Sequence, residues 1–241
     1  MPKVLPAPIQ WVDRLYGLHK GQPGFLIGNG WSGRYYDSAQ MKRKGILLGC
    51  NLAFTKHPLD YLVWQDSAIN GRCLRARNVT KVIPIRKRKR SGELGLKKDV
   101  FYFGFDRRKR GVPGAVELTN SGGIGLQLLY HFGCNPIFLV GCDCELILDK
   151  NLKFHGNVFK DKQAMKVEAN GKKAVKCEEV HINGRTAYTT KALKKFAKKF
   201  KQLKNELSDV EIYKLGDFGI VDIEAIDVKE FWSDKHPNIS R

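Results

Sequence analysis

The stretch GFLIGNGWSG at residues 24–33 decides the fold that we expect for this chain. Its apolar residues 25–27 form a short strand, and the glycines that follow form a tight turn. A second stretch, SGGIGLQLL at 121–129, starts with a glycine turn and continues as a helix. Glycine lets a backbone approach a ligand closely, and amide groups at such turns and helix starts suit phosphate. The two stretches predict either a nucleotide held between them or two tight turns without a ligand.

Further short apolar segments that end in polar residues predict an α/β fold, with a Rossmann-like, mostly parallel sheet flanked by helices. Buried parallel strands are apolar along their whole length. A helix over 122–132 leads into one such strand, and a helix over 190–207 carries leucine and phenylalanine on one face and lysine on the other. This succession of elements is typical of an α/β sheet. The expected strands lie at 25–27, 45–51, 59–66, 79–85, 136–143 and 210–215.

Two segments interrupt this pattern within what we expect to be one domain over residues 1–241. Residues 86–114 place the aromatic run Val100–Phe105 between two basic clusters, and we interpret them as a basic inserted hairpin or excursion. Residues 149–180 are lysine-rich and irregular, and we interpret them as a lid-like segment.

The charge of the chain is unusual. Lysine and arginine number 43 against 24 for aspartate and glutamate, which gives a formal net charge of +19. This excess predicts a polyanionic partner, such as nucleic acid, a phosphorylated glycan or an anionic membrane, or else a solvated basic surface with no partner. The residues that we expect to hold a polyanionic acceptor flank the aromatic run; they are Arg86, Arg88, Arg90, Arg107, Arg108 and Arg110.

Cysteine spacing and hydropathy limit the chemistry and the location. None of the six cysteines has the paired CxxC spacing of a zinc site, so we expect reduced, packed thiols rather than a metal site or disulfides. The chain lacks an apolar signal segment and a run long enough to span a bilayer. We therefore expect a cytoplasmic protein; its oligomeric state is left open.

Polar residues at the ends of the expected strands are the candidate site, because ligands bind at the carboxyl ends of strands in open α/β sheets. Asn29, Asn51, Asp66 and Asp143 hold these positions, and for each acid the alternative is a loop cap. The amide groups of Ser121, Gly122 and Gly123 could hold a second group of the ligand.

Two familiar nucleotide-binding signatures are incomplete. Residues 28–33 match GxGxxG, but the next strand ends in Cys50 and Asn51 rather than in the acid that binds a dinucleotide ribose, which disfavours NAD. The chain has no GxxxxGK[ST] segment and is not a P-loop enzyme. His155 and His181 lie in or beside the irregular segment, where each is either a general base on a lid or a solvated loop histidine.

The order of these motifs resembles a superfamily that contains bacterial sialyltransferases, the flagellar motility accessory factors and the archaeal 6-hydroxymethylpterin pyrophosphokinase domain. The resemblance rests on Gly-Asn-Gly-x-Ser at 28–32, Cys-Asn at 50–51, Ser-Gly-Gly at 121–123 and Ile-Phe-Leu-Val-Gly-Cys-Asp at 137–143. It covers about residues 24–66 and 119–145.

This resemblance implies a Rossmann-like sheet that binds a nucleotide-activated donor. By the same resemblance, Gly28, Asn29, Gly30 and Ser32 line the donor phosphate, Asn51 contacts phosphate or ribose, and Ser121 and Gly122 hold the nucleoside. Asp143 lies at the following strand tip. A late histidine acts as the base, with His181 in the best position and His155 second.

Three functions are consistent with these features. The leading one is a glycosyltransferase with a nucleotide-activated sugar as donor, and with modified DNA as acceptor, as in viral systems that decorate hydroxymethylated bases; an anionic glycan is the second acceptor. The next is an ATP-dependent pyrophosphokinase acting on a small hydroxymethyl compound such as a pterin, in which Asp66 and Asp143 hold Mg²⁺. The third is a non-catalytic nucleic-acid-binding protein.

Overall fold

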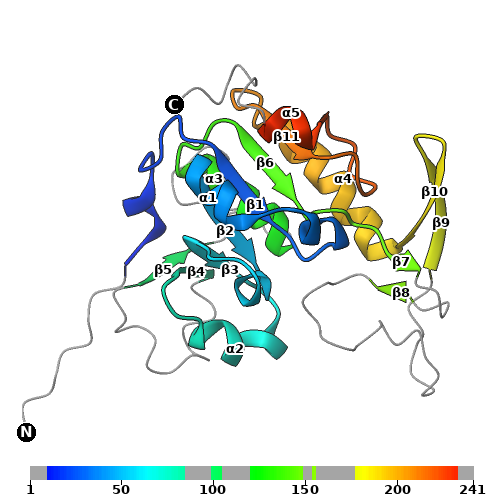
Figure 1. The fold of residues 1–241 in the computed structure, drawn as a ribbon. Coiled ribbons are helices and arrows are strands. Elements are labelled where there is room, and N and C mark those ends of the chain that lie inside the picture. Colours follow the sequence, from blue (N-terminus) through cyan, green and yellow to red (C-terminus); the bar gives the residue numbers. More distant parts are fainter. Residues whose placement is uncertain (1–9, 85–98, 105–119, 149–153, 156–176, 233–241) are drawn as a thin grey trace, which may run out of the picture.

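The computed structural model describes residues 10–84, 99–104, 120–148, 154–155 and 177–232, which are built around a central sheet (Figure 1). The sheet strands are β1 (Gly24–Ile27), β2 (Ile46–Cys50), β3 (Tyr61–Val63), β4 (Thr80–Pro84), β5 (Val100–Phe103), β6 (Ile137–Val140), β11 (Ile212–Leu215) and β12 (Ala225–Ile226). They form an 8-stranded sheet in the order β12-β11-β6-β1-β2-β3-β4-β5, and neighbouring strands run parallel. The predicted parallel α/β sheet is therefore confirmed.

Helices cover both faces of the sheet. Successive side chains of a strand point to opposite faces, so in β1 Leu26 joins one apolar core and its neighbours Phe25 and Ile27 join another. The first core packs under α3 (Ser121–His131) and α4 (Lys191–Glu206). The second packs under α1 (Ser38–Lys44), α2 (Asn70–Arg75) and α5 (Val228–Trp232).

The sequence accounts for α4 directly. Thr190 caps its start, with the side-chain oxygen accepting a hydrogen bond of 3.2 Å from the Leu193 amide. Ala197, Phe200 and Leu203 recur at three-residue steps and are buried, whereas most of the lysines between them are exposed. The amphipathic pattern predicted this helix almost to the residue.

The sheet order defines where a ligand can bind. The chain runs outward from β1 to β5, then crosses to the other side of β1 to form β6, β11 and β12. The order therefore reverses between β1 and β6, and crevices form outside the carboxyl ends of strands at such a point. The turns after Ile27 and Val140 meet there.

Two sequence interpretations need correction. The aromatic segment is not part of an inserted hairpin, because β5 pairs in parallel with β4 at the edge of the sheet. Tyr102 and Phe103 are buried there and pack in the core instead of being free to stack on bases. The arginines expected to hold the acceptor (Arg86, Arg88, Arg90, Arg107, Arg108 and Arg110) lie outside the described residues.

The late segment is more regular than the sequence suggested. β9 (Cys177–Ile182) and β10 (Arg185–Thr190) form an antiparallel hairpin, so residues 177–180 belong to a strand and not to an irregular lid. β8 (Phe154–His155) pairs with β7 (Ile147–Leu148). The rest of residues 149–180 lies outside the described part of the chain.

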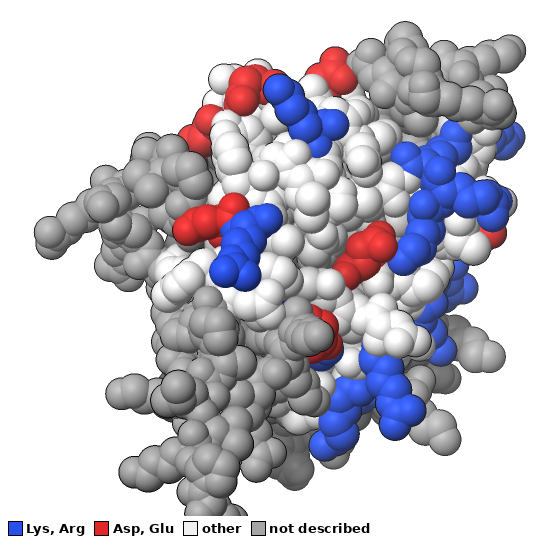
Figure 2. All heavy atoms as spheres, turned by 90° about the vertical axis from the view of Figure 1, so that its left-hand side faces the viewer, with Lys and Arg blue, Asp and Glu red and all other residues white. Residues whose placement is uncertain are grey.

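The charged side chains are unevenly distributed over the surface. On the face shown in Figure 2, lysines and arginines gather along one side and the lower edge, and acidic residues are fewer and scattered. None of the described helices has the length and apolar character needed to cross a membrane.

Candidate functional site

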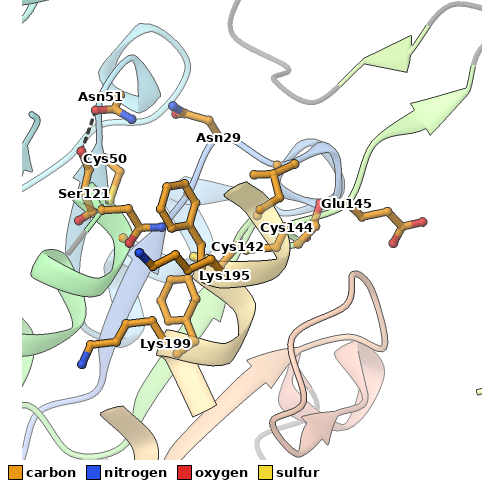
Figure 3. Close-up of a pocket in the computed structure, with 18 of the residues that line it drawn as sticks. Asn29, Cys50, Asn51, Ser121, Cys142, Cys144, Glu145, Lys195 and Lys199 are labelled. Atoms are coloured by element: carbon orange, nitrogen blue, oxygen red, sulfur yellow. Dashed lines mark hydrogen bonds between the residues drawn. The ribbon is translucent and has the colours of Figure 1, made fainter. Parts of the chain in front are cut away.

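A cavity of about 1150 Å³ opens at the carboxyl ends of β1, β2, β3 and β6. We call it the carboxyl-end pocket. Its walls are the turns that follow these strands, the start of α3 and one face of α4 (Figure 3). It lies at the reversal of the strand order, as predicted for a ligand site in this class of sheet.

The glycines after β1 are required by packing against the turn after β6. A Cβ atom on Gly28 would lie 2.2 Å from the carbonyl oxygen of Gly141, and one on Gly30 would lie 2.6 Å from the same oxygen and from Asp143 Oδ2. The two amide groups are already used, since Gly28 donates to the Val140 carbonyl and Gly30 to the Gly141 carbonyl. In this conformation these amides are not available to a phosphate.

Asp143 joins the two turns. Both of its carboxylate oxygens accept hydrogen bonds from Ser32, one from the amide at 2.8 Å and one from the hydroxyl. The side chain is buried, and burial raises its pKa above the ordinary value, with the bonds from Ser32 acting in the opposite direction. Asp143 is therefore a positioned carboxylate that binds a proton more readily than an ordinary carboxylate.

On the other side of the pocket, the end of β2 meets the start of α3. Asn51 has a positive φ of 54°, and its side-chain oxygen accepts a 3.0 Å hydrogen bond from the Ser121 hydroxyl (Figure 3). Asn120 caps α3 by accepting from the Gly123 amide. The Gly123 amide is therefore used within the helix cap, and the Ser121 and Gly122 amides are the ones left at the helix start.

Lysines of α4 face this arrangement. Lys195, Lys198 and Lys199 line the pocket, and Figure 3 shows Lys195 and Lys199 extending toward the side where Ser121 lies. Within the described part of the chain, neither Lys195 nor Lys198 has an acidic partner. Gly122 lies against the Phe200 ring, which sets α4 close to α3.

By contrast, the carboxylates that line the pocket are already engaged. Glu145 forms a two-bond pair with Arg185, at 2.7 and 2.8 Å. Asp66 accepts a hydrogen bond from the Ala68 amide and so caps a short 3-10 helix, Ser67–Ile69. Asp143 is held by Ser32. Only Glu145 is paired with a cation, because the hydrogen bonds to Asp66 and Asp143 come from neutral groups. The positive charge available to an anionic ligand is therefore that of the α4 wall, where Lys195 and Lys198 lack acidic partners among the described residues.

Two orphaned polar atoms add to the evidence for a ligand. Asn29 Oδ1 and Gln65 Nε2 are buried at the pocket without a hydrogen-bond partner in the described structure. Buried polar groups in proteins are usually satisfied, so an unpaired donor and acceptor in one pocket indicate groups that a ligand or solvent completes.

The thiols in the pocket are poor nucleophiles. Cys50, Cys142 and Cys144 line it as free cysteines, as expected. Burial raises the pKa of Cys50 and Cys144 to about 12 and that of Cys142 well above its ordinary value, so all three stay protonated at neutral pH. The longer predicted strand implied that Cys142 and Cys144 lie within it. In the structure β6 ends at Val140, and both cysteines follow it.

The structure brings most of the predicted donor-site residues together. Those that line the pocket are Gly28, Asn29, Gly30, Asn51, Asp66, Ser121, Gly122 and Asp143. Ser32 and Gly123 lie just behind this lining and bond to Asp143 and Asn120. Their roles in binding stay predictions.

The predicted histidines are placed differently. His181 lies on β9 with 77% of its side chain exposed, and it lines a separate cavity beside the loop after β11 rather than the carboxyl-end pocket. His155 lies on β8, and its side chain is not among those described. The geometry therefore gives His181 no contact with the proposed donor site.

Sequence reasoning missed the α4 wall and two further residues of the lining, Asn120 and Glu145. The signal for the wall was present, because the lysines at 195, 198 and 199 adjoin Phe196 and Phe200 on the amphipathic helix. Only the direction in which α4 packs shows that this edge of the helix faces a pocket. Glu145 and Asn120 gave no comparable pattern.

Comparison with known proteins supports the fold. No protein-family model matches the chain, and no curated protein matches it significantly. Among solved structures, it is similar to the MAf glycosyltransferase from Magnetospirillum magneticum AMB-1, with a TM-score of 0.61 and 12% identity. The match covers 97% of this chain and 42% of that one, so the chain spans less than half of the glycosyltransferase's length. At this identity the similarity establishes a shared fold.

Proposed function

We propose that this chain is a glycosyltransferase that takes its sugar from a nucleotide-activated donor bound in the carboxyl-end pocket. The observation that carries the proposal is the α4 wall of the pocket, where Lys195 and Lys198 have no acidic partner among the described residues and face the free amides at the start of α3. Cations and free amides stabilise the negative charge that develops on a leaving phosphate. The fold that it shares with a MAf glycosyltransferase supports the same reading.

We place the donor phosphate between α4 and the start of α3. The Ser121 and Gly122 amides lie at the positive end of an 11-residue helix, and the lysines of α4 lie opposite them. Gly28, Gly30 and Ser32 then shape the pocket floor, since their amides are used. Asn29, Asn51 and Gln65 supply amide groups for the ribose or the base.

The acceptor hydroxyl needs a general base, and we place it at Asp143 in preference to His181. Asp143 lines the pocket, and its raised pKa makes it a better proton acceptor than an ordinary carboxylate. The acceptor oxygen then attacks the sugar carbon, its proton passes to the carboxylate, and the nucleotide leaves with the bond electrons. Modified DNA remains the preferred acceptor and an anionic glycan the second.

The pyrophosphokinase alternative has less support. It requires carboxylates that hold Mg²⁺ together, and the two predicted for this task are Asp66 and Asp143. Within the described ranges no three acidic, histidine or cysteine residues are grouped as a metal site.

A thermal-shift panel of nucleotides and nucleotide sugars tests the proposal. A ligand bound only by the folded protein raises the melting temperature by mass action, and we expect at least one nucleotide to do so. The double variant Lys195→Gln and Lys198→Gln should bind that nucleotide with an affinity lower by about tenfold or more, because charge-assisted contacts are lost. The control is Lys191→Gln, an exposed lysine of the same helix outside the pocket. Affinity that is equal in both variants, or no shift with any nucleotide, would contradict the proposal.

A further inference from the structure

A stack of flat groups lies on the surface beside the carboxyl-end pocket. The guanidinium carbon of Arg34 lies 4.1 Å from the ring centre of Trp31 and 5.2 Å from that of Tyr35. Tyr35 in turn stacks on Phe218, with ring centres 5.6 Å apart and planes inclined by 17°. We call these residues, Trp31, Arg34, Tyr35 and Phe218, the Arg34 stack.

The stack is exposed and is not neutralised. Tyr35 and Phe218 are 56% and 41% exposed, which is unusual for rings of this size. Arg34 is also exposed, and across the described ranges it has no carboxylate partner. With its guanidinium carbon over two rings and no carboxylate partner, Arg34 keeps N–H groups for an oxyanion, which a guanidinium can bind through two hydrogen bonds.

The stack is fixed to the wall of the pocket. Trp31, Arg34 and Tyr35 belong to the 3-10 helix Trp31–Tyr35, whose Ser32 bonds to Asp143. Phe218 lies in the loop after β11. In the same loop the Ile220 amide donates a hydrogen bond of 2.8 Å to the Asp143 carbonyl. Asp143 therefore bonds to both segments that carry the stack and also lines the pocket, which connects the stack to the pocket wall.

We propose that the Arg34 stack is a binding site for single-stranded nucleic acid, with Arg34 on a backbone phosphate and the exposed Phe218 ring, at the end of the stack, against a base. Guanidinium groups and aromatic rings are the groups that single strands stack on, and a net charge of +19 attracts a chain of phosphates. Chemistry on a base also needs that base out of the duplex. The assignment of this strand as the acceptor rests on the proposed function; its binding does not.

Fluorescence anisotropy with a short labelled DNA single strand, measured over a series of salt concentrations, tests this site. Arg34→Ala should weaken binding by about tenfold and lower the log–log salt slope by about 0.7, the value for one phosphate on a single strand. Phe218→Leu should weaken binding by several-fold at an unchanged slope, because it removes stacking and no charge. Arg77→Ala removes an exposed arginine away from the stack and should change the affinity less than twofold.

Each outcome is decisive. Equal losses in Arg34→Ala and Arg77→Ala, or wild-type affinity in Phe218→Leu, overturn the site. Binding of a sialylated or sulfated glycan that depends on Arg34, without binding of DNA, overturns the choice of nucleic acid. The nucleotide thermal shifts are measured without DNA and therefore test the proposed function separately. If no nucleotide shifts the melting temperature but DNA binding depends on Arg34, the transferase function is rejected and the nucleic-acid site at the Arg34 stack is retained.

Discussion

Asp143 and Ser32 form the contact on which the carboxyl-end pocket depends. A serine hydroxyl and amide on one turn satisfy a buried carboxylate on another, 111 residues away in sequence. A charged group that loses its donors while buried keeps its desolvation cost, so the contact matters more than an exposed hydrogen bond of the same length.

The strength of this contact should depend on pH. Burial raises the pKa of Asp143, and the hydrogen bonds from Ser32 lower it by a smaller amount. The stabilisation that Ser32 provides is therefore present while the carboxylate is charged, and it is lost as the pH falls through the raised pKa of Asp143. We expect Ser32→Ala to cost about 1–3 kcal/mol of unfolding free energy at pH 7 and less near pH 4. Urea denaturation at both pH values measures this, with Ser67→Ala, an exposed serine, as control. A cost that is constant with pH would argue against a charged Asp143.

At the scale of the element, α3 shows that a glycine in a helix can serve packing alone. A Cβ atom on Gly125 would lie 2.5 Å from Leu26 Cδ1 and 2.9 Å from Leu48 Cδ2. The absent side chain lets α3 lie directly on β1 and β2, and this brings Ser121 to Asn51.

The same substitution in two helices should therefore have opposite effects. Gly125→Ala overpacks the core and should lower the free energy of unfolding by about 1–3 kcal/mol. A Cβ atom on Gly71, in the exposed α2, would have open space, with Arg75 Nη1 at 3.6 Å as its nearest neighbour. Gly71→Ala should therefore raise the free energy of unfolding by about 0.4–1 kcal/mol. Thermal or urea unfolding of both variants checks the signs. A stabilising Gly125→Ala would mean that α3 lies farther from the sheet.

At the scale of the whole molecule, the β9–β10 hairpin fastens to the loop that forms the pocket wall. Arg185 forms an ion pair with Glu145. The Thr189 hydroxyl donates a hydrogen bond of 2.8 Å to the Cys144 carbonyl, and the Leu146 amide donates one of 2.7 Å to the Tyr188 carbonyl. β10 then runs directly into α4. The hairpin thus orients both the loop and the lysine-bearing helix.

A double-mutant cycle measures this docking. Arg185→Ala leaves Glu145 buried without its cation and should cost about 1–3 kcal/mol, moderated because the arginine is partly exposed. Adding Glu145→Ala removes the unpaired charge and should recover much of that loss. Urea denaturation of the wild type, both single variants and the double variant gives the four free energies of the cycle. Hydrogen exchange of β9 and β10 should quicken in Arg185→Ala. Strictly additive losses would show that the pair does not hold the hairpin.

Local sequence patterns specify the regular elements and the residues at the strand ends. Strands β1 and β6 and helices α3 and α4 follow from local apolar patterns, and parallel strands must bring their carboxyl ends to one edge. Asn51 and Asp143 were therefore predicted to lie at one edge of the sheet, and Ser121 was predicted from the glycine turn that opens a helix; all three line the pocket.

Only the tertiary structure decided what these elements face. It made β5 an edge strand of the sheet, turned the lysines of α4 into a pocket wall, used the amides of Gly28 and Gly30 within the backbone and set Phe218 on Tyr35. Each of these depends on contacts between residues far apart in the chain. Local propensity cannot specify such contacts, because the free energy that fixes them comes from packing and hydrogen bonding that exist once the chain has closed on itself.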